Sequence, residues 1–392
     1  MTTLTTLRLT DFRSYAALDI RPASRIVALE GPNGSGKTNL LEAISLLAPG
    51  RGLRGAKFAE LARRGGSGGW AVAAQLTDAG RRFTLGTGID GPGAERRKLL
   101  LDGDPVTAAA AAAAFACVWL TPQMDRLFTE GASARRRFLD RLTLALAPAH
   151  ASEVAAFEAA SANRNRQIEQ GTADAAWLAT IEDSMARHAA ALTASRLDLI
   201  ARVNAMLARG AFAPFPAATL ALDCPIGARL AIEPAIAVED WLRRLYARTR
   251  AEPVAAVSPQ RADLLLADAG SGLAAALAST GQQRAMLVAI VLAHAALIAT
   301  LRGAAPVLLL DEPFVHLDAA HRLALGEALR QSPSQVFCTA TDRAHLRALG
   351  DDAAVWLVSP GRIGGVGSGD QPGPAFEPAA GRVAIGDDGP MR

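Results

Sequence analysis

The sequence has little cysteine, little lysine and few aromatic residues. Its 392 residues contain 3 Cys, which lie far apart and form no CxxC pair. This spacing gives no support for a disulfide framework or a cysteine-based zinc site, so we predict three buried thiols. Aromatic residues make up 5% of the chain, whereas 50% of it is hydrophobic and rich in alanine. That apolar content supports a large core and excludes a disordered chain.

The sequence also shows no clear signal peptide and no clear membrane-spanning segment. The first residues alternate polar and apolar side chains and place Arg8 and Asp11 where a signal peptide is apolar. No run of about eighteen bulky uncharged residues stands out, so we expect no membrane span and no membrane partner. These features predict a cytoplasmic protein, and its length predicts two or three domains.

Charge is unevenly distributed although the net charge is only +3. Residues 1–100 carry fifteen Arg and Lys against eight Asp and Glu, which leaves the rest of the chain acidic. A basic N-terminal portion indicates a polyanionic partner, although a surplus of this size also occurs on ordinary surfaces. Charge alone therefore leaves a nucleic-acid partner open.

Hydrophobic periodicity predicts two α/β portions. An apolar strand at residues 25–30 precedes a glycine-rich loop and a helix at 39–47. Further strands are expected at 70–76, 82–89 and 116–120. From Asp263 the order is strand, helix, strand, helix, strand. This alternation is typical of a mostly parallel sheet, so we predict an α/β nucleotide-binding lobe that is discontinuous in the sequence.

A helical insertion separates the two portions. Residues 134–207 have a helical pattern broken at Pro148 and near Gly171, and the second half reads as an amphipathic hairpin. His188 lies within the apolar stripe, so we predict a core histidine rather than a ligand. The expected organisation is a first lobe part at 1–130, a mainly helical arm at 131–255, a second lobe part at 256–360 and a flexible tail at 361–392.

The segment GPNGSGKT fits the phosphate-binding pattern G-x-x-x-x-G-K-[ST] between a strand and a helix. Its glycines let backbone N–H groups turn toward one anion, and the helix N-terminus adds partial positive charge. Lys37, one of three lysines, is expected at the β and γ phosphates, and Thr38 at Mg²⁺. The predicted nucleotide contacts are Gly31, Pro32, Asn33, Gly34, Ser35, Gly36, Lys37, Thr38 and Asn39.

Two carboxylates follow the apolar segment LLL at the end of a later strand. Ligands bind at that end of parallel strands. We predict that Asp311 holds Mg²⁺ and that Glu312 polarises the water that attacks the γ-phosphate.

The segment STGQQR opens the helix before that strand, with Ser279 as its N-cap and Gly281 allowing close backbone approach. Such a helix start is a second phosphate-binding surface. Because the P-loop already serves the nucleotide of its own chain, we predict that Ser279, Gly281 and Gln282 contact the nucleotide of a partner subunit.

The order of P-loop, STGQQR, LLLDEP and VHLD resembles the ABC-type ATPase core shared by transporters, SMC proteins and RecF proteins. FRSY, GPNGSGKTNLLEAI, GRGLR and VWLTPQMDRLFTEGASARRRFLDRL occur in the order and spacing of the RecF family of DNA replication and repair proteins. The resemblance covers the chain to about residue 360.

That resemblance implies further site residues. Gln123 is similar to the Q-loop residue that senses Mg²⁺, and Asp318 to the D-loop aspartate that faces the partner subunit. The chain departs from the RecF pattern by having Glu312 after Asp311, and Thr341 stands where transporters have a switch histidine. The resemblance therefore implies slow hydrolysis with Lys37, Asp311, Glu312 and Gln123 as the catalytic set.

Arginine clusters recur along the chain and suit nucleic-acid phosphates, although any single cluster is more often a solvated face. The selected candidates are Arg51, Arg54, Arg135, Arg136 and Arg137. The resemblance implies a weak DNA-stimulated ATPase that dimerises on ATP. It would bind duplex DNA near gaps or single-strand/double-strand junctions, in the nucleoid, and assist a RecR-type mediator.

Three alternatives remain open at this point. A transporter ATPase subunit would have its signature much nearer the P-loop. An SMC-like structural ATPase would have far longer periodic helices for a coiled-coil arm. A DNA clamp that binds ATP without hydrolysing it is disfavoured by Lys37, Asp311 and Glu312 and mildly favoured by Thr341.

Overall fold

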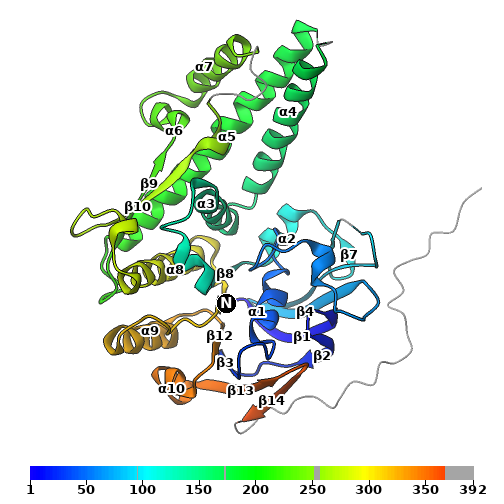
Figure 1. Cartoon of the computed structure of the whole chain (residues 1–392), viewed down its shortest axis with the longest axis vertical. Coiled ribbons are helices and arrows are strands. Elements are labelled where there is room, and N and C mark those ends of the chain that lie inside the picture. Colours follow the sequence, from blue (N-terminus) through cyan, green and yellow to red (C-terminus); the bar gives the residue numbers. More distant parts are fainter. Residues whose placement is uncertain (95, 172–173, 251–256, 367–392) are drawn as a thin grey trace, which may run out of the picture.

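The structure is a head built on two six-stranded sheets, with a helical arm rising from it (Figure 1). The computed structural model describes residues 1–94, 96–171, 174–250 and 257–366. The predicted boundary between residues 255 and 256 and the predicted tail from residue 367 onward lie outside these ranges.

One sheet of the head is antiparallel, in the strand order β2-β1-β4-β5-β6-β7. Its strands are β1 (Thr3–Phe12), β2 (Tyr15–Ile20), β4 (Trp70–Asp78), β5 (Arg81–Ile89), β6 (Lys98–Leu101) and β7 (Asp104–Pro105). Burial alternates along β5, so one face of the sheet packs on the core and the other meets solvent. The strands expected near 70–76 and 82–89 are confirmed, but they pair antiparallel rather than joining a parallel sheet.

The other sheet of the head has the order β14-β13-β3-β12-β11-β8, and all neighbours except β14 run parallel. Its strands are β3 (Ile26–Glu30), β8 (Cys117–Leu120), β11 (Val307–Leu310), β12 (Val336–Ala340), β13 (Ala353–Ser359) and β14 (Arg362–Val366). Every residue of β8, β11 and β12 is buried, as a parallel sheet covered on both faces requires. The expected mostly parallel sheet and the buried thiols of Cys117 and Cys338 are confirmed.

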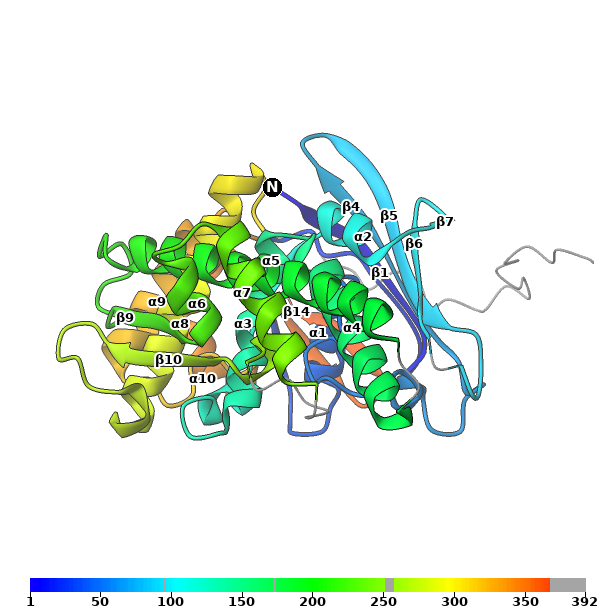
Figure 2. The ribbon, with the colours of Figure 1, turned by 90° about the horizontal axis from the view of Figure 1, so that it is seen from above.

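Helices cover both faces of the parallel sheet. The helix α1 (Lys37–Ser45) lies between the two sheets, whereas α8 (Thr280–Arg302), α9 (Ala319–Gln331) and α10 (Arg343–Leu346) lie on the opposite side (Figure 1). From above, the antiparallel sheet forms one flank of the head and α8 with α9 the other (Figure 2). The short helix α2 (Ala108–Ala114) connects the antiparallel sheet to β8.

The helix α8 corrects one expectation from the sequence. It is long and apolar enough to span a membrane by length and composition, although no such run was expected. However, 78% of its most apolar window is buried inside the head. We therefore interpret α8 as the core helix of the head. Its ends are set locally, by a capping box of Ser279 with Gln282 and by left-handed Gly303 at φ 68°.

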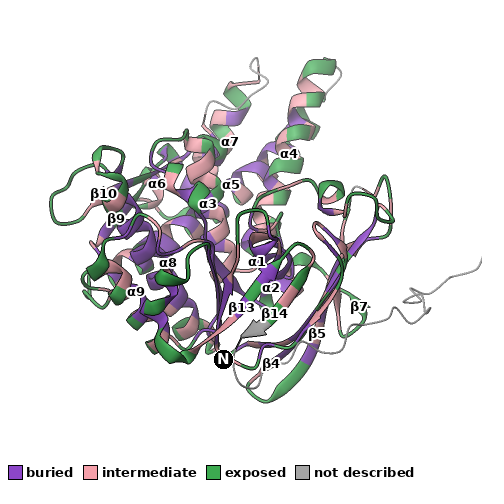
Figure 3. Cartoon of the chain, turned by 60° about the horizontal axis from the view of Figure 1, so that its bottom comes forward, coloured by how far each residue is buried: buried purple, intermediate pink, exposed green. Residues whose placement is uncertain are grey.

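The arm consists mainly of helices. They are α3 (Ala132–Leu146), α4 (His150–Gln170), α5 (Ala175–Leu207), α6 (Pro225–Leu230) and α7 (Ala235–Arg248). The predicted breaks occur as expected, because α4 ends at left-handed Gly171 and Asp174 caps the N-terminus of α5. Buried residues of α5 face α4 and the head, whereas the projecting ends of α4 and α7 are mostly exposed or half-buried (Figure 3).

The arm has a small core of its own. Phe157 of α4 and Met185 of α5 pack there with residues of α6 and α7. A buried ionic cluster joins the same helices: Arg164 and Arg250 both donate to Glu182, which is 2% exposed. Farther along α5, Leu199 and Val203 belong to the core of the head. The helix α5 therefore ties the arm to the head through two separate cores.

Two strands differ from their predictions. The segment LLLAD forms β10 (Asp263–Asp268), which pairs antiparallel with β9 (Ala218–Asp223) instead of joining the parallel sheet. Burial alternates in β10, so it lacks the two covered faces of a central parallel strand. The strand β14 overturns the flexible-tail prediction for residues 362–366, because it pairs with β13 across a turn at Gly361.

His188 is not the core residue expected from the helical stripe. It is half-buried, and its Nδ1 lies 2.7 Å from Glu153 Oε2 on α4. The apolar stripe of α5 is wide, and His188 lies at its edge near solvent. There its side chain contacts Glu153 instead of packing in the core.

Short 3₁₀ turns complete the fold. They are η1 (Phe58–Leu61), η2 (Pro122–Arg126), η3 (Pro259–Arg261), η4 (Ala275–Leu277) and η5 (Arg347–Asp352).

Candidate nucleotide site

The P-loop joins β3 to α1, as the strand–loop–helix pattern predicts. Gly34 and Gly36 have φ of 79° and 110°, which only glycine adopts readily. At Gly31 a Cβ atom would lie 2.3 Å from the carbonyl oxygen of Val358 on β13. These glycines therefore shape a loop whose backbone can face an anion at the start of α1.

Lys37 lies over this loop. Its Nζ donates to the carbonyl oxygens of Gly31 at 2.6 Å and Pro32 at 3.1 Å, and it lies 4.0 Å from Glu312 Oε1. Burial lowers the pKa of the ammonium, and the charges of Glu312 and Asp311 oppose this shift. The side chain is thus positioned between the P-loop and the carboxylates that follow β11.

The hydroxyl and the carboxylate that are predicted to hold Mg²⁺ form a hydrogen bond with each other. Thr38 Oγ1 donates to Asp311 Oδ1 at 3.0 Å, and Thr339 Oγ1 donates to the same oxygen at 2.7 Å. Oxygen donors of this kind are those that Mg²⁺ prefers. Folding brings Thr38 and Asp311 together because β3 and β11 flank β12 in the parallel sheet.

Glu312 has an unusual backbone conformation and one unsatisfied carboxylate oxygen. Its φ is 48°, and its N–H donates to Thr339 Oγ1 at 2.8 Å. Its Oε2 is buried without a hydrogen-bond partner among the described residues. Burial raises the pKa of this carboxyl, and the neighbouring Lys37 only partly offsets the shift. A carboxyl with a raised pKa, beside an ammonium and a second carboxylate, is suited to accept a proton.

The start of α8 lies on the surface. Ser279 and Gln282 form an exposed capping box, in which each side chain accepts a hydrogen bond from the other's backbone N–H. A Cβ at Gly281 would lie 3.3 Å from the carbonyl oxygen of His316, so this helix start packs against the loop before α9. Asp318 caps α9, and its side chain is 65% exposed. Among the described residues, no hydrogen bond or ion pair joins this surface to the P-loop.

Arg284 is a site residue that the sequence analysis did not single out. It is 1% exposed and donates to Asp125 Oδ1 on η2 at 2.8 Å and to the carbonyl oxygen of Glu312 at 3.0 Å. The guanidinium therefore connects α8, the turn that contains Gln123, and the backbone of Glu312. The sequence signal that could have identified Arg284 is its position as the last residue of the segment STGQQR. Gln123 itself is exposed on η2.

A polar network on α1 was also missed. Glu42 is fully buried, accepts two hydrogen bonds of 2.8 Å from Arg13 and lies 3.3 Å from Arg54. Arg54 also donates to Asn39 Oδ1, and the amide of Asn39 donates to Ser14 Oγ. Segments FRSY and GRGLR thus hold the helix that begins at the P-loop.

The arginines predicted to contact DNA differ in how far contacts within the protein already occupy them. Arg135 makes two 2.7 Å hydrogen bonds to the Asp263 carboxylate, and Arg136 donates to the carbonyl oxygen of Ala262. Both connect α3 to the segment around β10. Arg51 and Arg137 are exposed, whereas Arg54 is partly occupied by the network on α1.

The chain is similar to known proteins over almost its whole length. Residues 3–359 match the RecF/RecN/SMC N terminal domain family. The DNA replication and repair protein RecF of Mesorhizobium japonicum is 42% identical over 370 residues, covering 93% of this chain and 98% of the relative. RecF of Rhizobium etli is 40% identical over 369 residues, covering 92% and 98%.

Solved structures share the fold. A structure of the recombination mediator protein RecF with ATP, in the RecFOR pathway, has a TM-score of 0.80 at 19% identity and covers 93% of this chain and 99% of that one. An SMC head bound to the C-winged helix domain of ScpA has a TM-score of 0.53 at 16% identity, covering 93% and 96%.

The fold and the nucleotide motifs define an ATP-binding head domain of the ABC and SMC type. Within this class, the chain belongs to the RecF family of DNA replication and repair proteins. The resemblance and the fold class predicted from the sequence are confirmed. The family assignment places the function in DNA replication and repair rather than in transport.

Proposed function

We propose that the chain hydrolyses ATP slowly and uses the nucleotide to control its grip on DNA. The observation that carries this proposal is Glu312, whose carboxylate has a buried, unpartnered oxygen and lies 4.0 Å from the ammonium of Lys37. A buried carboxylate oxygen without a hydrogen bond is costly, so its presence beside the P-loop favours a chemical role.

Thr38 and Asp311 would hold Mg²⁺, because their oxygens already converge within 3.0 Å. Gln123 is our proposed third residue at this position. When bound, the ion would neutralise charge on the phosphates. The residues of the chain do the remaining work: Lys37 exchanges its carbonyl contacts for phosphate oxygens, the P-loop N–H groups orient the phosphates, and Glu312 accepts a proton from the attacking water.

The exposed start of α8 supports an ATP-dependent dimer. Ser279, Gly281 and Gln282 form a capped helix N-terminus, and Asp318 is close by on the loop before α9. This surface is directed to solvent rather than to the P-loop of its own chain. We therefore propose that it contacts the nucleotide of a second copy, head to tail.

The family assignment supports a proposal about partners. We propose duplex DNA near gaps or single-strand/double-strand junctions, with Arg51 and Arg137 as exposed candidate contacts and Arg54 as a third. Arg135 and Arg136 are weaker candidates because they are engaged by the segment around β10. A RecR-type mediator and a nucleoid location in the cytoplasm complete the proposal.

Phosphate release by the full chain, measured with and without gapped duplex DNA, tests this function. We expect slow turnover that DNA increases and that Glu312→Gln abolishes. Turnover no greater than that of Glu312→Gln, with or without DNA, would instead support the non-hydrolysing clamp.

A further inference from the structure

Arg141 of α3 is half-buried, and its guanidinium has no acidic partner among the described residues. It stacks on Trp119, 4.5 Å from the ring centroid, and lies 5.1 Å from the ring centroid of Phe138. Its Nη2 donates to the weak acceptor Met124 Sδ at 3.6 Å. In the described part of the chain, no carboxylate lies within 4.0 Å of it. Burial lowers the pKa of this guanidinium to about 10, so the group remains charged at neutral pH.

Other buried or half-buried arginines of the head and arm have clear structural partners. Arg97 donates to the carbonyl oxygens of Leu46 and Ala48 after the end of α1. Arg164 is bound by Glu182. Arg196 makes two hydrogen bonds to Asp140. Charges buried in proteins are usually paired in this way. Aromatic stacking and one weak hydrogen bond to sulfur leave most N–H donors of Arg141 available to a ligand.

Arg141 lines a large cleft between the head and the arm. The cavity has a volume of about 870 Å³ and is bounded by the loop 49–55, the turn η2, and the helices α3 and α4. Arg51, Arg54 and Arg137 are also on its wall. We call this cavity the arm cleft.

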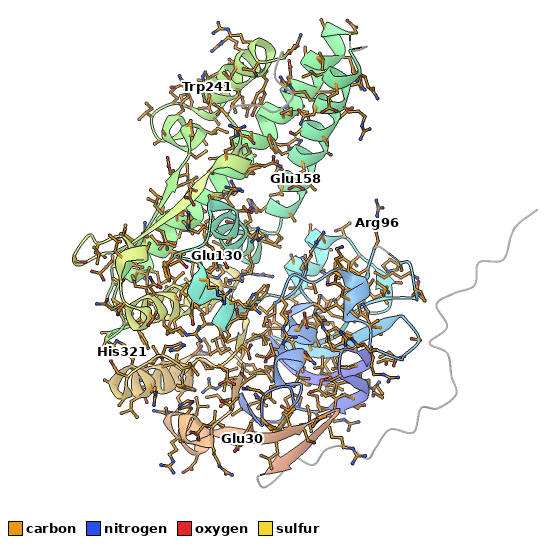
Figure 4. All side chains as sticks on the ribbon, in the orientation of Figure 1. Glu30, Arg96, Glu130, Glu158, Trp241 and His321 are labelled. Atoms are coloured by element: carbon orange, nitrogen blue, oxygen red, sulfur yellow. The ribbon has the colours of Figure 1, made fainter. Side chains whose placement is uncertain are left out.

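The acids of the arm cleft do not neutralise these arginines. Asp140 is occupied by Arg196 and by His150, whose Nε2 lies 3.0 Å away. Glu130, which follows η2, and Glu158 of α4 are both exposed (Figure 4). Arg54 pairs with Glu42 outside the cleft. The other three arginines face only two acids, and none of these five side chains has an ion-pair partner among the described residues, so the cleft has an excess of positive charge.

We propose that the arm cleft binds a single strand of nucleic acid and that Arg141 contacts one of its phosphates. The proposal rests on the DNA-binding function proposed above and assigns it a surface. The volume is in the range of pockets that hold small ligands, so it suits a short stretch of one strand rather than the width of a duplex. The half-buried apolar side chains of Leu144 and Val154 in the lining would face the bases.

The test compares Arg141→Met with the unchanged full chain. Methionine keeps an unbranched side chain between the two rings but removes the charge. Binding is measured over a range of salt concentrations for a single-stranded oligonucleotide, a blunt duplex and ATP. We expect oligonucleotide affinity to fall about tenfold, as for one lost charged hydrogen bond. The logarithmic salt slope should decrease by about 0.7, as for one lost phosphate contact. Affinity for the blunt duplex and for ATP should stay unchanged.

A matched control is Arg229→Met in the arm. Arg229 stacks on Trp241 at 4.3 Å but lies outside the cleft and pairs with Glu233 at 2.7 Å. It should keep full oligonucleotide binding. If Arg141→Met loses its cooperative melt, Arg137→Glu on the exposed wall of the same cleft replaces it and should weaken binding of the oligonucleotide more than binding of the blunt duplex.

The outcomes separate this inference from the proposed function. Unchanged oligonucleotide binding in the cleft variant would overturn it, and so would a chain that binds duplex but no single strand. An equal loss of oligonucleotide and ATP binding would also overturn it, because the phosphates in the cleft would then be those of the nucleotide. If the unchanged chain binds no DNA of any form, the proposed function itself fails.

Discussion

Glu312 and Lys37 show how individual residues create the chemistry of the site. Burial raises the pKa of the Glu312 carboxyl. Burial lowers the pKa of the Lys37 ammonium. Each shift makes the charged form less stable than in water. Such positions weaken the folded protein, so their presence beside a P-loop is better explained by function than by folding.

The raised pKa of Glu312 predicts the effect of Glu312→Gln on stability. Because the folded pKa exceeds the unfolded one, the carboxyl favours folding at low pH, and this contribution is lost as pH rises through the folded pKa. At neutral pH, without nucleotide, Glu312→Gln should therefore raise the melting temperature by roughly 1–3 °C. The gain should shrink as pH falls. A calorimetric melt that is lower for the variant at neutral pH would contradict this prediction.

Lys37→Ala should abolish ATP-dependent dimerisation. The substitution removes a charged phosphate contact, which should weaken ATP binding by about tenfold or more, and with it the ligand that bridges two subunits. Sedimentation with ATP measures the dimer, and Lys57→Ala is the control because that lysine is exposed outside the P-loop. If Lys37→Ala forms as much dimer with ATP as the unchanged chain, the assignment of Lys37 to the ATP phosphates is contradicted.

At the scale of elements, sequence patterns predicted most of what positions the site. The strand–loop–helix at the P-loop and the apolar run before Asp311 are local signals, and both are correct. The antiparallel pairing of β10 was not predictable, because its partner β9 lies about forty residues earlier and pairing depends on which edges remain available. Arg284 was missed for a similar reason: its partners come from η2 and from Glu312 just after β11, which only the fold brings together.

The strand β14 leads to a prediction about truncation. Ending the chain after Pro360 removes β14 from the edge of β13, which itself pairs with β3 beside the P-loop. We expect this truncation to lower the melting temperature by several degrees, because an edge strand and its hydrogen bonds are lost. A chain ending after Val366 should melt like the full chain. Equal melting of all three chains would show that β14 adds nothing to stability.

The start of α8 provides a separate test of the dimer. Ser279→Arg should leave ATP binding to the monomer intact, because this surface makes no described contact with the P-loop of its own chain. The bulky cation should block docking of the partner's nucleotide, so the dimer should be lost in sedimentation. Loss of monomer ATP binding, measured by titration, would contradict the assignment to the partner.

At the scale of the whole molecule, the helix α5 connects the arm to the head. One half packs in the arm's own core and the other in the core of the head. The arm cleft lies between these parts, within reach of η2 and the loop 49–55. The sequence predicted an arm on a discontinuous lobe. It could not predict the cleft, because that space is set by the angle at which α3 and α4 leave the head.

The lifetime of DNA complexes formed by Glu312→Gln tests the central claim most directly. General-base removal typically slows a reaction by about 10² to 10⁴-fold, while Lys37, Thr38 and Asp311 keep their ATP contacts. In the presence of ATP and Mg²⁺, Glu312→Gln should stall as a dimer and dissociate from gapped duplex DNA more slowly than the unchanged chain. Asp311→Asn should dissociate faster, because it loses the metal contact and the dimer. Hydrolysis of ATP by Glu312→Gln at the unchanged rate, or faster release of DNA, would contradict the account.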